Sequence, residues 1–334
     1  MQETGQELGK AQFSPQAYCK RLAYSPLLAF CPPMRVLPIL AASLLWFLGD
    51  GEARSKLAVL TSFAPIRSMT LNVAGEAADV SVLIPPGTGP HDYAFSPSDI
   101  AKIAHADLLI VNGVGLESWL DKGVKAAGKR NLQIIDTSRG VGLLNGPELP
   151  RLGSGRTDPD EGGPNPHIWL SPRNAIIQVK NIRDGLAARD PQNAQIYYRN
   201  ANLFTERLQT LDQDIIAATR SIENKTLITF HDTFPYFARD YGFTVAATFE
   251  EFAGKQPSPK TIQQLRQIIE SAHVAALFSE PQYSAKAMQV FAQELKIPVV
   301  QLNPMETGEG GINFYEDVMR KNLETLVAAF HGRG

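Results

Sequence analysis

The chain has little cysteine, since only Cys19 and Cys31 occur among its 334 residues and both precede Met34. The compact spacings HExxH and CxxC, which hold zinc in many proteins, are also missing. We therefore expect no disulfide and no thiolate metal site after Met34. A metal site in this chain has to draw its ligands from distant parts of the sequence.

The chain also lacks an excess of charge of one sign. The chain has 32 Lys and Arg against 34 Asp and Glu, a formal net charge of -2. Such a balance gives no field that attracts nucleic acid or an anionic membrane, so we expect no nucleic-acid partner. A hydrophobic content of 44% with 8% aromatic residues is typical of a globular protein, and the length allows two domains.

The apolar run from Val36 to Gly49 is shorter than the about 20 residues of a membrane span. It follows a basic residue and is followed by small residues near Ala53, which is the layout of a secretory signal. We expect residues 1–55 to be an upstream extension plus a signal peptide, with the true start at Met34. A buried core helix is the alternative, and bulky Phe30 argues against lipid attachment at Cys31.

Short β-rich runs alternate with helical stretches in two parts of the chain. The first part has "KLAVLTSF", "DVSVLI", "LLIVN" and "QIIDTS", and the second has "TLITF", "TVAATF", "AALFSE" and "PVVQLN". This alternation predicts an α/β fold of two (β/α) lobes with largely parallel sheets. We place the lobes at residues 56–189 and 221–334.

The segment 190–220 between the lobes has a different pattern. Asp190 is a candidate N-cap with Pro191 at the first helical position. Apolar residues then recur at spacings of three and four along one face: Tyr197, Ala201, Phe204, Leu208, Leu211, Ile215 and Ala218. About 30 residues would make a rod of roughly 45 Å, so we expect one long rigid connecting helix. The region 140–165 has no such periodicity and is expected to be a long surface loop.

Three of the six histidines follow predicted strands or precede a predicted helix. His91 follows "DVSVLI" in a Gly and Pro-rich turn, His231 follows "TLITF", and His167 stands before a helix that Ser171 and Pro172 would begin. Ligands of open parallel sheets gather outside the carboxyl ends of the strands. All three can therefore face one cleft between the lobes, where three neutral imidazoles suit a borderline cation such as zinc. The other histidines, His105, His273 and His331, are expected to be structural or exposed.

The residues around these histidines resemble the motifs of a known family. "GTGPHDYAFSPSDIAKIAHADLLIVNGVGLESWL", "NPHIWLSPRNA" and "ITFHDTFPYFARDYG" are similar to the metal-ligand motifs of the zinc and manganese solute-binding proteins that serve bacterial ABC importers. The similarity covers about residues 57–330. It implies two lobes joined by a rigid helix, one metal between them, and His91, His167 and His231 as ligands. Because manganese members usually have a carboxylate at the third position, His231 points to zinc, with Mn²⁺ as the alternative.

Two features depart from the family pattern. The fourth ligand, commonly an Asp in a motif like "LDPL", corresponds here to Asn303 in "LNPM". Asn303 is thus a tentative fourth ligand, with a water or Glu280 as alternatives. Many zinc members also have a His-rich loop between the first two ligands, where this chain offers only acidic residues: Asp158, Asp160 and Glu161.

The leading interpretation is a periplasmic high-affinity zinc receptor that is exported by its signal peptide. We expect it to act as a monomer and to deliver zinc to an ABC importer permease. A manganese or iron receptor, a metallochaperone and an adhesin are alternatives. A zinc hydrolase is a further one, since three histidines and an open position also suit a metal-activated water. No general base is evident beyond Glu280 and Asp232, so we do not expect an enzyme. Asp92 and Asp232, each next to a predicted ligand, are expected to lie outside the first coordination shell.

Overall fold

The computed structural model describes residues 56–331, apart from residues 92, 146–162, 250–257 and 283–284. For residues 285–289 only the backbone is described. The expected upstream extension and signal peptide, both cysteines, Asp92 and the acidic residues of the 140–165 loop lie outside the described residues. None of the helices in the described ranges has the length and apolar character needed to cross a membrane.

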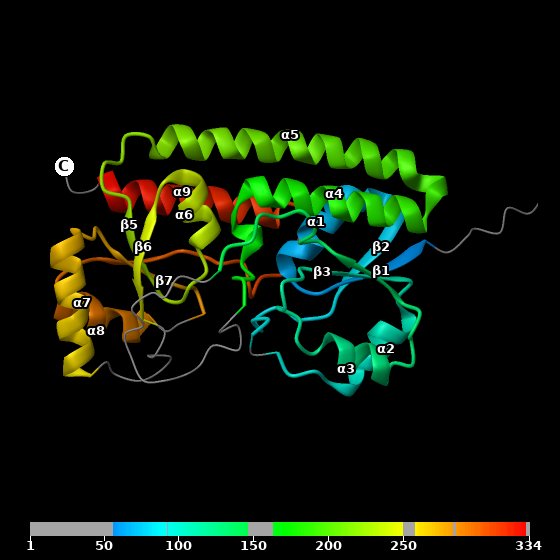
Figure 1. The fold of residues 1–334 in the computed structure, drawn as a ribbon, viewed down its shortest axis with the longest axis horizontal. Helices are drawn as coiled ribbons and strands as arrows, with labels where there is room; N and C mark the ends of the chain where they lie inside the picture. Colours follow the sequence, from blue (N-terminus) through cyan, green and yellow to red (C-terminus); the bar gives the residue numbers. More distant parts are fainter. Residues whose placement is uncertain (1–55, 92, 146–162, 250–257, 283–284, 332–334) are drawn as a thin grey trace, which may run out of the picture. The chain divides into compact units, whose positions relative to one another are not determined.

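Two four-stranded sheets form the framework of the described part of the chain (Figure 1). The first has the order β2-β1-β3-β4 and the second β6-β5-β7-β8, and every neighbouring pair is parallel. The strands of the first are β1 (Leu57–Thr61), β2 (Ala78–Val82), β3 (Leu108–Val111) and β4 (Gln133–Asp136). Those of the second are β5 (Thr226–Thr229), β6 (Thr244–Thr248), β7 (Leu277–Ser279) and β8 (Val299–Gln301). The predicted α/β fold with two lobes is confirmed.

Helices cover the sheets of both lobes. Around the first sheet lie α1 (Ala64–Ala74), α2 (Pro97–His105), α3 (Leu120–Ala126) and α4 (Pro172–Arg189). Around the second lie α6 (Pro235–Tyr241), α7 (Pro259–Ala272), α8 (Ala285–Leu295) and α9 (Phe314–His331). In Figure 1, α1 and α4 lie on one side of the first sheet and α2 and α3 on the other. Each sheet is therefore enclosed, as all-parallel sheets generally are.

The long connecting helix is α5 (Ala194–Thr219), with 26 residues. It begins after a 3₁₀ turn at Pro191–Asn193, because the Asp190 carboxylate accepts hydrogen bonds from the side chains of Asn193 and Tyr197 instead of capping the helix. Its expected apolar stripe is buried from Tyr197 to Ile215. The helix packs on α1 and α4 along one part of its length and on α9 along the other, so it contacts both lobes (Figure 1).

One apolar cluster extends through both lobes. It joins the first sheet and α4 to buried residues of the second lobe, such as Phe234, Phe278 and Tyr315. A second cluster, which includes Phe249, Leu265 and Phe291, fills the space between the second sheet and its outer helices. Because close-packed interiors resist deformation, this shared core makes the connection between the lobes stiff.

Candidate metal site

The three predicted histidines come from loops on both lobes. His91 lies between β2 and α2, His167 directly precedes the 3₁₀ turn Ile168–Leu170 that leads into α4, and His231 follows β5. Ser171 accepts the N–H of Asn174 and so caps α4 as expected. The structure brings the ring nitrogens of the three histidines together, with Nε2 of His167 lying 3.1 Å from Nε2 of His91 and 3.3 Å from Nε2 of His231.

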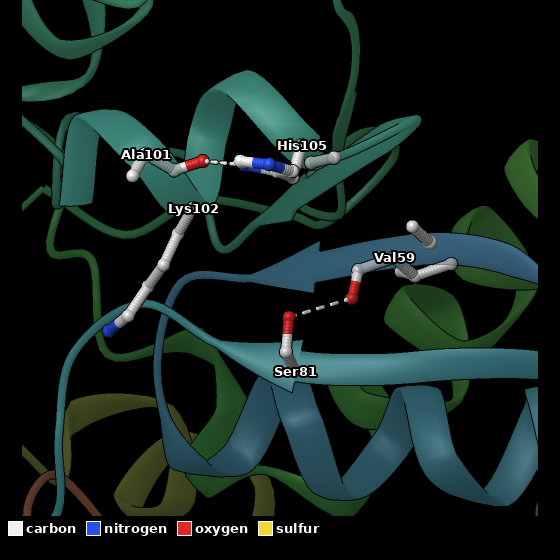
Figure 2. A pocket seen from close by; sticks show the side chains of 7 residues that line it. Val59, Ser81, Ala101, Lys102 and His105 are labelled. Carbon is white, nitrogen blue, oxygen red and sulfur yellow. Dashed lines mark hydrogen bonds between the residues drawn. The ribbon is translucent and has the colours of Figure 1, made fainter. Parts of the chain in front are cut away.

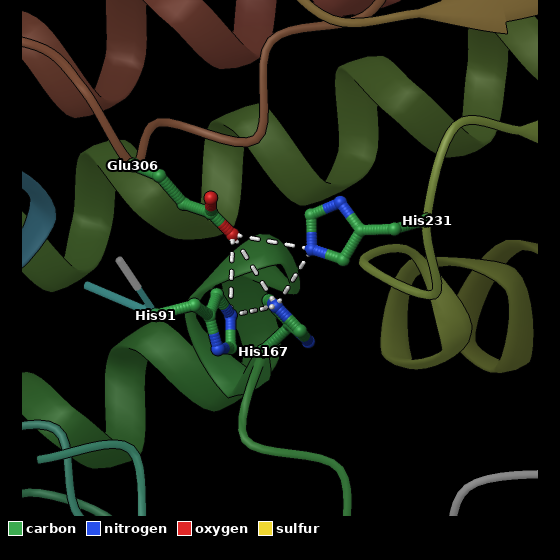
Figure 3. A group of neighbouring side chains, drawn as sticks. All are labelled: His91, His167, His231 and Glu306. Carbon is green, nitrogen blue, oxygen red and sulfur yellow. Dashed lines mark hydrogen bonds and ion pairs between the residues drawn. The ribbon is translucent and has the colours of Figure 1, made fainter. Parts of the chain in front are cut away.

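A carboxylate completes this group (Figure 3). Oε1 of Glu306 lies 3.3 Å from Nε2 of His167, 3.5 Å from Nε2 of His231 and 3.7 Å from Nε2 of His91. Figure 3 shows this oxygen and the histidine nitrogens pointing toward one another. Glu306 follows β8, so each lobe supplies two members of what we call the four-residue site: His91, His167, His231 and Glu306.

The spacing of these four atoms fits a tetrahedral ion. Zinc holds nitrogen and oxygen ligands at about 2.0–2.1 Å, and the ligand atoms of a regular tetrahedron of that size are about 3.3–3.4 Å apart. Five of the six separations are between 3.1 and 3.7 Å, and all four atoms lie within 4.8 Å of one another. The four atoms thus surround a point from which a zinc-sized cation could reach all of them.

Glu306 also lacks a conventional hydrogen bond at its central oxygen. The residue is 5% exposed, and its buried Oε1 has no hydrogen bond of normal geometry within the described residues, although the three histidine Nε2 atoms lie 3.3–3.7 Å away. A buried acceptor without a hydrogen bond is costly and needs an explanation, which a bound cation would supply. The observation therefore supports a metal-binding role for the group.

The burial of the four side chains is uneven. His167, His231 and Glu306 are between 2% and 7% exposed, whereas the His91 side chain is 18% exposed. Its loop contacts the second lobe where the N–H of Gly87 donates to the carbonyl of Thr307 at 2.8 Å. The side of the site formed by His91 is consequently the one nearest to solvent.

His167 is held in a neutral form suited to ligation. Its Nδ1 lies 3.0 Å from Oδ1 of Asn165, an acceptor, so the ring proton is on Nδ1 and the Nε2 lone pair faces the site. Burial lowers the pKa of His167 to about 4, against the opposing effect of Glu306. The imidazole therefore stays neutral at physiological pH.

His231 has a carboxylate behind it. Its Nδ1 lies 2.7 Å from Oε1 of Glu280, which again leaves Nε2 facing the site. Burial acts to lower the pKa of His231, but the charges of Glu280 and Glu306 raise it well above its usual value. Burial acts to raise the pKa of Glu306, but the nearby His231 holds this pKa well below its usual value. Glu280, considered above as a fourth ligand, thus contacts the ring nitrogen of His231 that faces away from the other histidines.

Asn303, the tentative fourth ligand, has a different set of contacts. Its Oδ1 accepts the N–H of Met305 at 2.7 Å, and its backbone pairs with the side chain of Asn322 on α9. Met305 has a φ of 66°, an unusual conformation for a residue with a side chain. The Asn303 side chain therefore supports the strained turn that precedes Glu306.

Glu306 was not predicted from the sequence. The residue stands in "LNPMETGEGG", three positions after Asn303 and just beyond the carboxyl end of β8, where ligands gather. Gly310, at a φ of 65°, allows the following chain to approach α1, because a Cβ there would lie 2.4 Å from the carbonyl oxygen of Ala64. A carboxylate between a predicted strand and a glycine-rich turn was the available signal.

The other residues singled out above lie apart from the four-residue site or pack beside it. His105, His273 and His331 are exposed. Nδ1 of His105 donates to the carbonyl of Ala101 at 2.7 Å, and its ring lines an open pocket (Figure 2). None of the other five histidines lines this pocket, whose walls are Ala58, Val59, Ser81, Ala101, Lys102, His105 and Ala106.

Trp119 and Trp169 are both buried. The ring of Trp169 packs against His167, and its Nε1 donates to the carbonyl of Pro304 at 2.8 Å. Trp169 therefore links the chain beside one histidine to the turn that carries Glu306. Trp119 packs against Tyr93 and Phe95 in the first lobe.

Comparison with known proteins gives the same result as the motifs. A family profile described as "Zinc-uptake complex component A periplasmic" matches residues 59–329. The chain belongs to this family. The resemblance noted from the sequence motifs is confirmed.

Several relatives agree with this membership. The chain is 31% identical over 289 residues to the zinc-binding protein AdcA of Streptococcus pyogenes, covering 82% of this chain and 56% of the relative. It is 30% identical to the high-affinity zinc uptake system protein ZnuA of Bacillus subtilis, covering 83% and 89%. The chain thus spans only about half of the length of the streptococcal relatives it matches.

Solved structures show the same fold. The zinc-bound ZnuA-like domain of Streptococcus pneumoniae AdcA has a TM-score of 0.71 at 30% identity, covering 83% of this chain and 99% of that one. The solute-binding protein FpvC of Pseudomonas aeruginosa, in complex with Mn²⁺, has a TM-score of 0.72 at 28% identity, covering 84% and 100%.

Proposed function

We propose that this protein is a high-affinity zinc receptor that binds one Zn²⁺ at the four-residue site and delivers it to the permease of an ABC importer. The observation that supports this most directly is the set of four converging donor atoms, two from each lobe, all within 4.8 Å of one another. Family membership and the zinc named in several relatives give independent support.

The donor set favours zinc over harder cations. Three imidazole nitrogens with one carboxylate oxygen suit zinc, whereas manganese prefers oxygen ligands in octahedral geometry. A relative from Yersinia pestis is named an iron-binding protein, and the FpvC complex contains Mn²⁺, so iron and manganese are the alternative cargoes. We rank them below zinc because only one of the four donors is oxygen.

The same geometry argues for transport rather than hydrolysis. Catalytic zinc sites keep a position open for water, whereas four protein ligands fill a tetrahedral shell. Four donors here surround one point and three of them are nearly fully buried. We therefore propose binding and release, without catalysis, by a monomer exported to the periplasm or cell surface, as the names of the family and of a lipoprotein relative suggest.

Metal titration of the purified protein tests this function. We expect one zinc ion per chain and displacement of bound manganese by a stoichiometric amount of zinc. Zinc should also raise the melting temperature, because a ligand that binds only the folded state stabilises it by mass action. Manganese that resists displacement by zinc, or several weakly bound zinc ions per chain, would overturn the proposal.

A further inference from the structure

Asn165 lies between the two most buried histidines and is itself buried. Its Oδ1 accepts the backbone N–H of His167 at 3.0 Å and also faces Nδ1 of the same histidine at 3.0 Å. Its Nδ2 donates to the backbone carbonyl of Asp232 at 2.8 Å and to Oδ2 of Asp232 at 3.1 Å. Both ends of one amide are thus engaged, each with a different lobe.

Chemistry fixes the orientation of this amide. A backbone N–H can only donate and a backbone carbonyl can only accept, so the oxygen of Asn165 has to face His167 and the nitrogen has to face Asp232. A ring nitrogen beside that oxygen forms a hydrogen bond only if it carries the proton. Asn165 therefore selects the tautomer in which Nε2 of His167 is unprotonated.

The second contact reaches the other lobe. Asp232 directly follows His231, so the Asn165 side chain joins the loop of one predicted ligand to the loop of another. The backbone of Asn165 is fixed as well: its N–H donates to the carbonyl of Leu144, and its carbonyl accepts the hydroxyl of Tyr236 at 2.7 Å. Tyr236 is fully buried on α6, so Asn165 is anchored independently of its side chain.

We propose that Asn165 is a positioning residue, which holds the His167 proton on Nδ1 and aligns the loops of His167 and His231 toward one ion. The proposal rests on the zinc-binding function proposed above. Without the amide oxygen, the ring proton of His167 can move to Nε2, which is the nitrogen that faces the other donors. Without the amide nitrogen, the direct hydrogen bonds from Asn165 to the second ligand loop are lost.

The tautomer of His167 can be measured without metal. Long-range ¹H–¹⁵N spectra of the zinc-free protein distinguish protonated from unprotonated ring nitrogens, and His167→Ala identifies the relevant signals. We expect the Nδ1-protonated form in the wild type and a mixture of tautomers in Asn165→Ala. Zinc affinity of Asn165→Ala should fall by about tenfold to a hundredfold, the usual effect of losing a partner of a metal-binding histidine.

Two further variants separate positioning from loop packing. Asn165→Asp keeps an acceptor for His167 but loses the donor to Asp232, so its tautomer should match the wild type while its zinc affinity lies between the wild type and Asn165→Ala. Tyr236→Phe removes the hydroxyl that binds the Asn165 backbone and leaves the side-chain amide in place, so its His167 tautomer should match the wild type.

An unchanged tautomer or unchanged zinc affinity in Asn165→Ala would overturn the proposal. Absence of zinc binding by the wild type would instead reject the proposed function. The tautomer measurement would still stand in that case.

Discussion

The two lobes have sheets of equivalent strand order, β2-β1-β3-β4 and β6-β5-β7-β8, yet the side chains beyond their strands differ in charge. The first lobe offers His91 and His167, with the neutral amide of Asn165 behind His167. The second offers His231 and Glu306, with the carboxylate of Glu280 behind His231. Negative charge at the site is therefore concentrated in the second lobe.

This difference assigns different roles to the two halves of the site. In the first lobe, burial keeps His167 neutral and ready to ligate. In the second lobe, the charges of Glu280 and Glu306 raise the pKa of His231, which favours a proton on both of its ring nitrogens when no metal is bound. A zinc ion that enters the site has to displace that proton, so the second lobe links metal binding to pH.

Removal of a ligand from either lobe should have the largest effect. We expect His167→Ala and His231→Ala each to weaken zinc binding by more than about a hundredfold, since even indirect partners of a metal ligand contribute ten- to a hundredfold. His105→Ala is the matched control, because this exposed histidine lies on α2 outside the site. Zinc titration with far-UV circular dichroism measures both binding and folding, and near wild-type affinity in a folded variant would remove that residue from the site.

The fourth ligand is tested by comparing Glu306 with Asn303. Glu306→Gln replaces a charged oxygen with a neutral one of the same size and should weaken zinc binding by about tenfold to a hundredfold. Asn303→Asp should leave affinity nearly unchanged, because aspartate can still accept the N–H of Met305. If Asn303→Asp tightens zinc and manganese binding while Glu306→Gln has no effect, Asn303 is the ligand instead.

Zinc affinity of the wild type should fall with decreasing pH. Metal binding requires neutral imidazoles, and the raised pKa of His231 means that zinc displaces a proton there at pH 7. With about one proton released, affinity should drop about tenfold per pH unit below the pKa of His231. Competition titrations from pH 8 to pH 5 measure this slope, and a flat profile would argue against a histidine site.

Glu280→Gln should have a smaller effect on affinity than the loss of a ligand, and the most specific effect on protons. The variant removes a charge that raises the pKa of His231, so fewer protons should be released on zinc binding at pH 7. Calorimetry in two buffers of different ionisation enthalpy counts these protons. An unchanged proton count would show that Glu280 does not control the protonation of His231.

The sequence predicted the framework well because its signals are local. Each of the eight quoted β-rich runs overlaps an observed strand, and the apolar stripe of the long helix is buried from Tyr197 to Ile215. The helices α1, α6 and α9 were not predicted, and for the first two the reason is physical. α1 is buried over most of its surface and so shows no single apolar stripe, and α6, with seven residues, is too short for periodicity to appear.

The site was predictable only in part. The three histidines stand at element ends, where the pattern of strands is informative, and the structure brings them together. The position of Glu306 depends on the turn that Asn303 and Met305 form. The contacts of Asn165 with Asp232 and of Glu280 with His231 had no sequence signal, since each joins residues far apart in the chain. Such partners emerge only from the tertiary structure.

X-ray absorption spectroscopy of the zinc-loaded protein tests the central claim, that both lobes contribute two ligands to one zinc ion, most directly. We predict four nitrogen and oxygen ligands at about 2.0–2.1 Å, with the outer-shell scattering of three imidazoles. The signal should drop to two imidazoles or be lost in His167→Ala and in His231→Ala alike. Six oxygen-rich ligands in the wild type, or a three-imidazole spectrum that survives either substitution, would contradict the account.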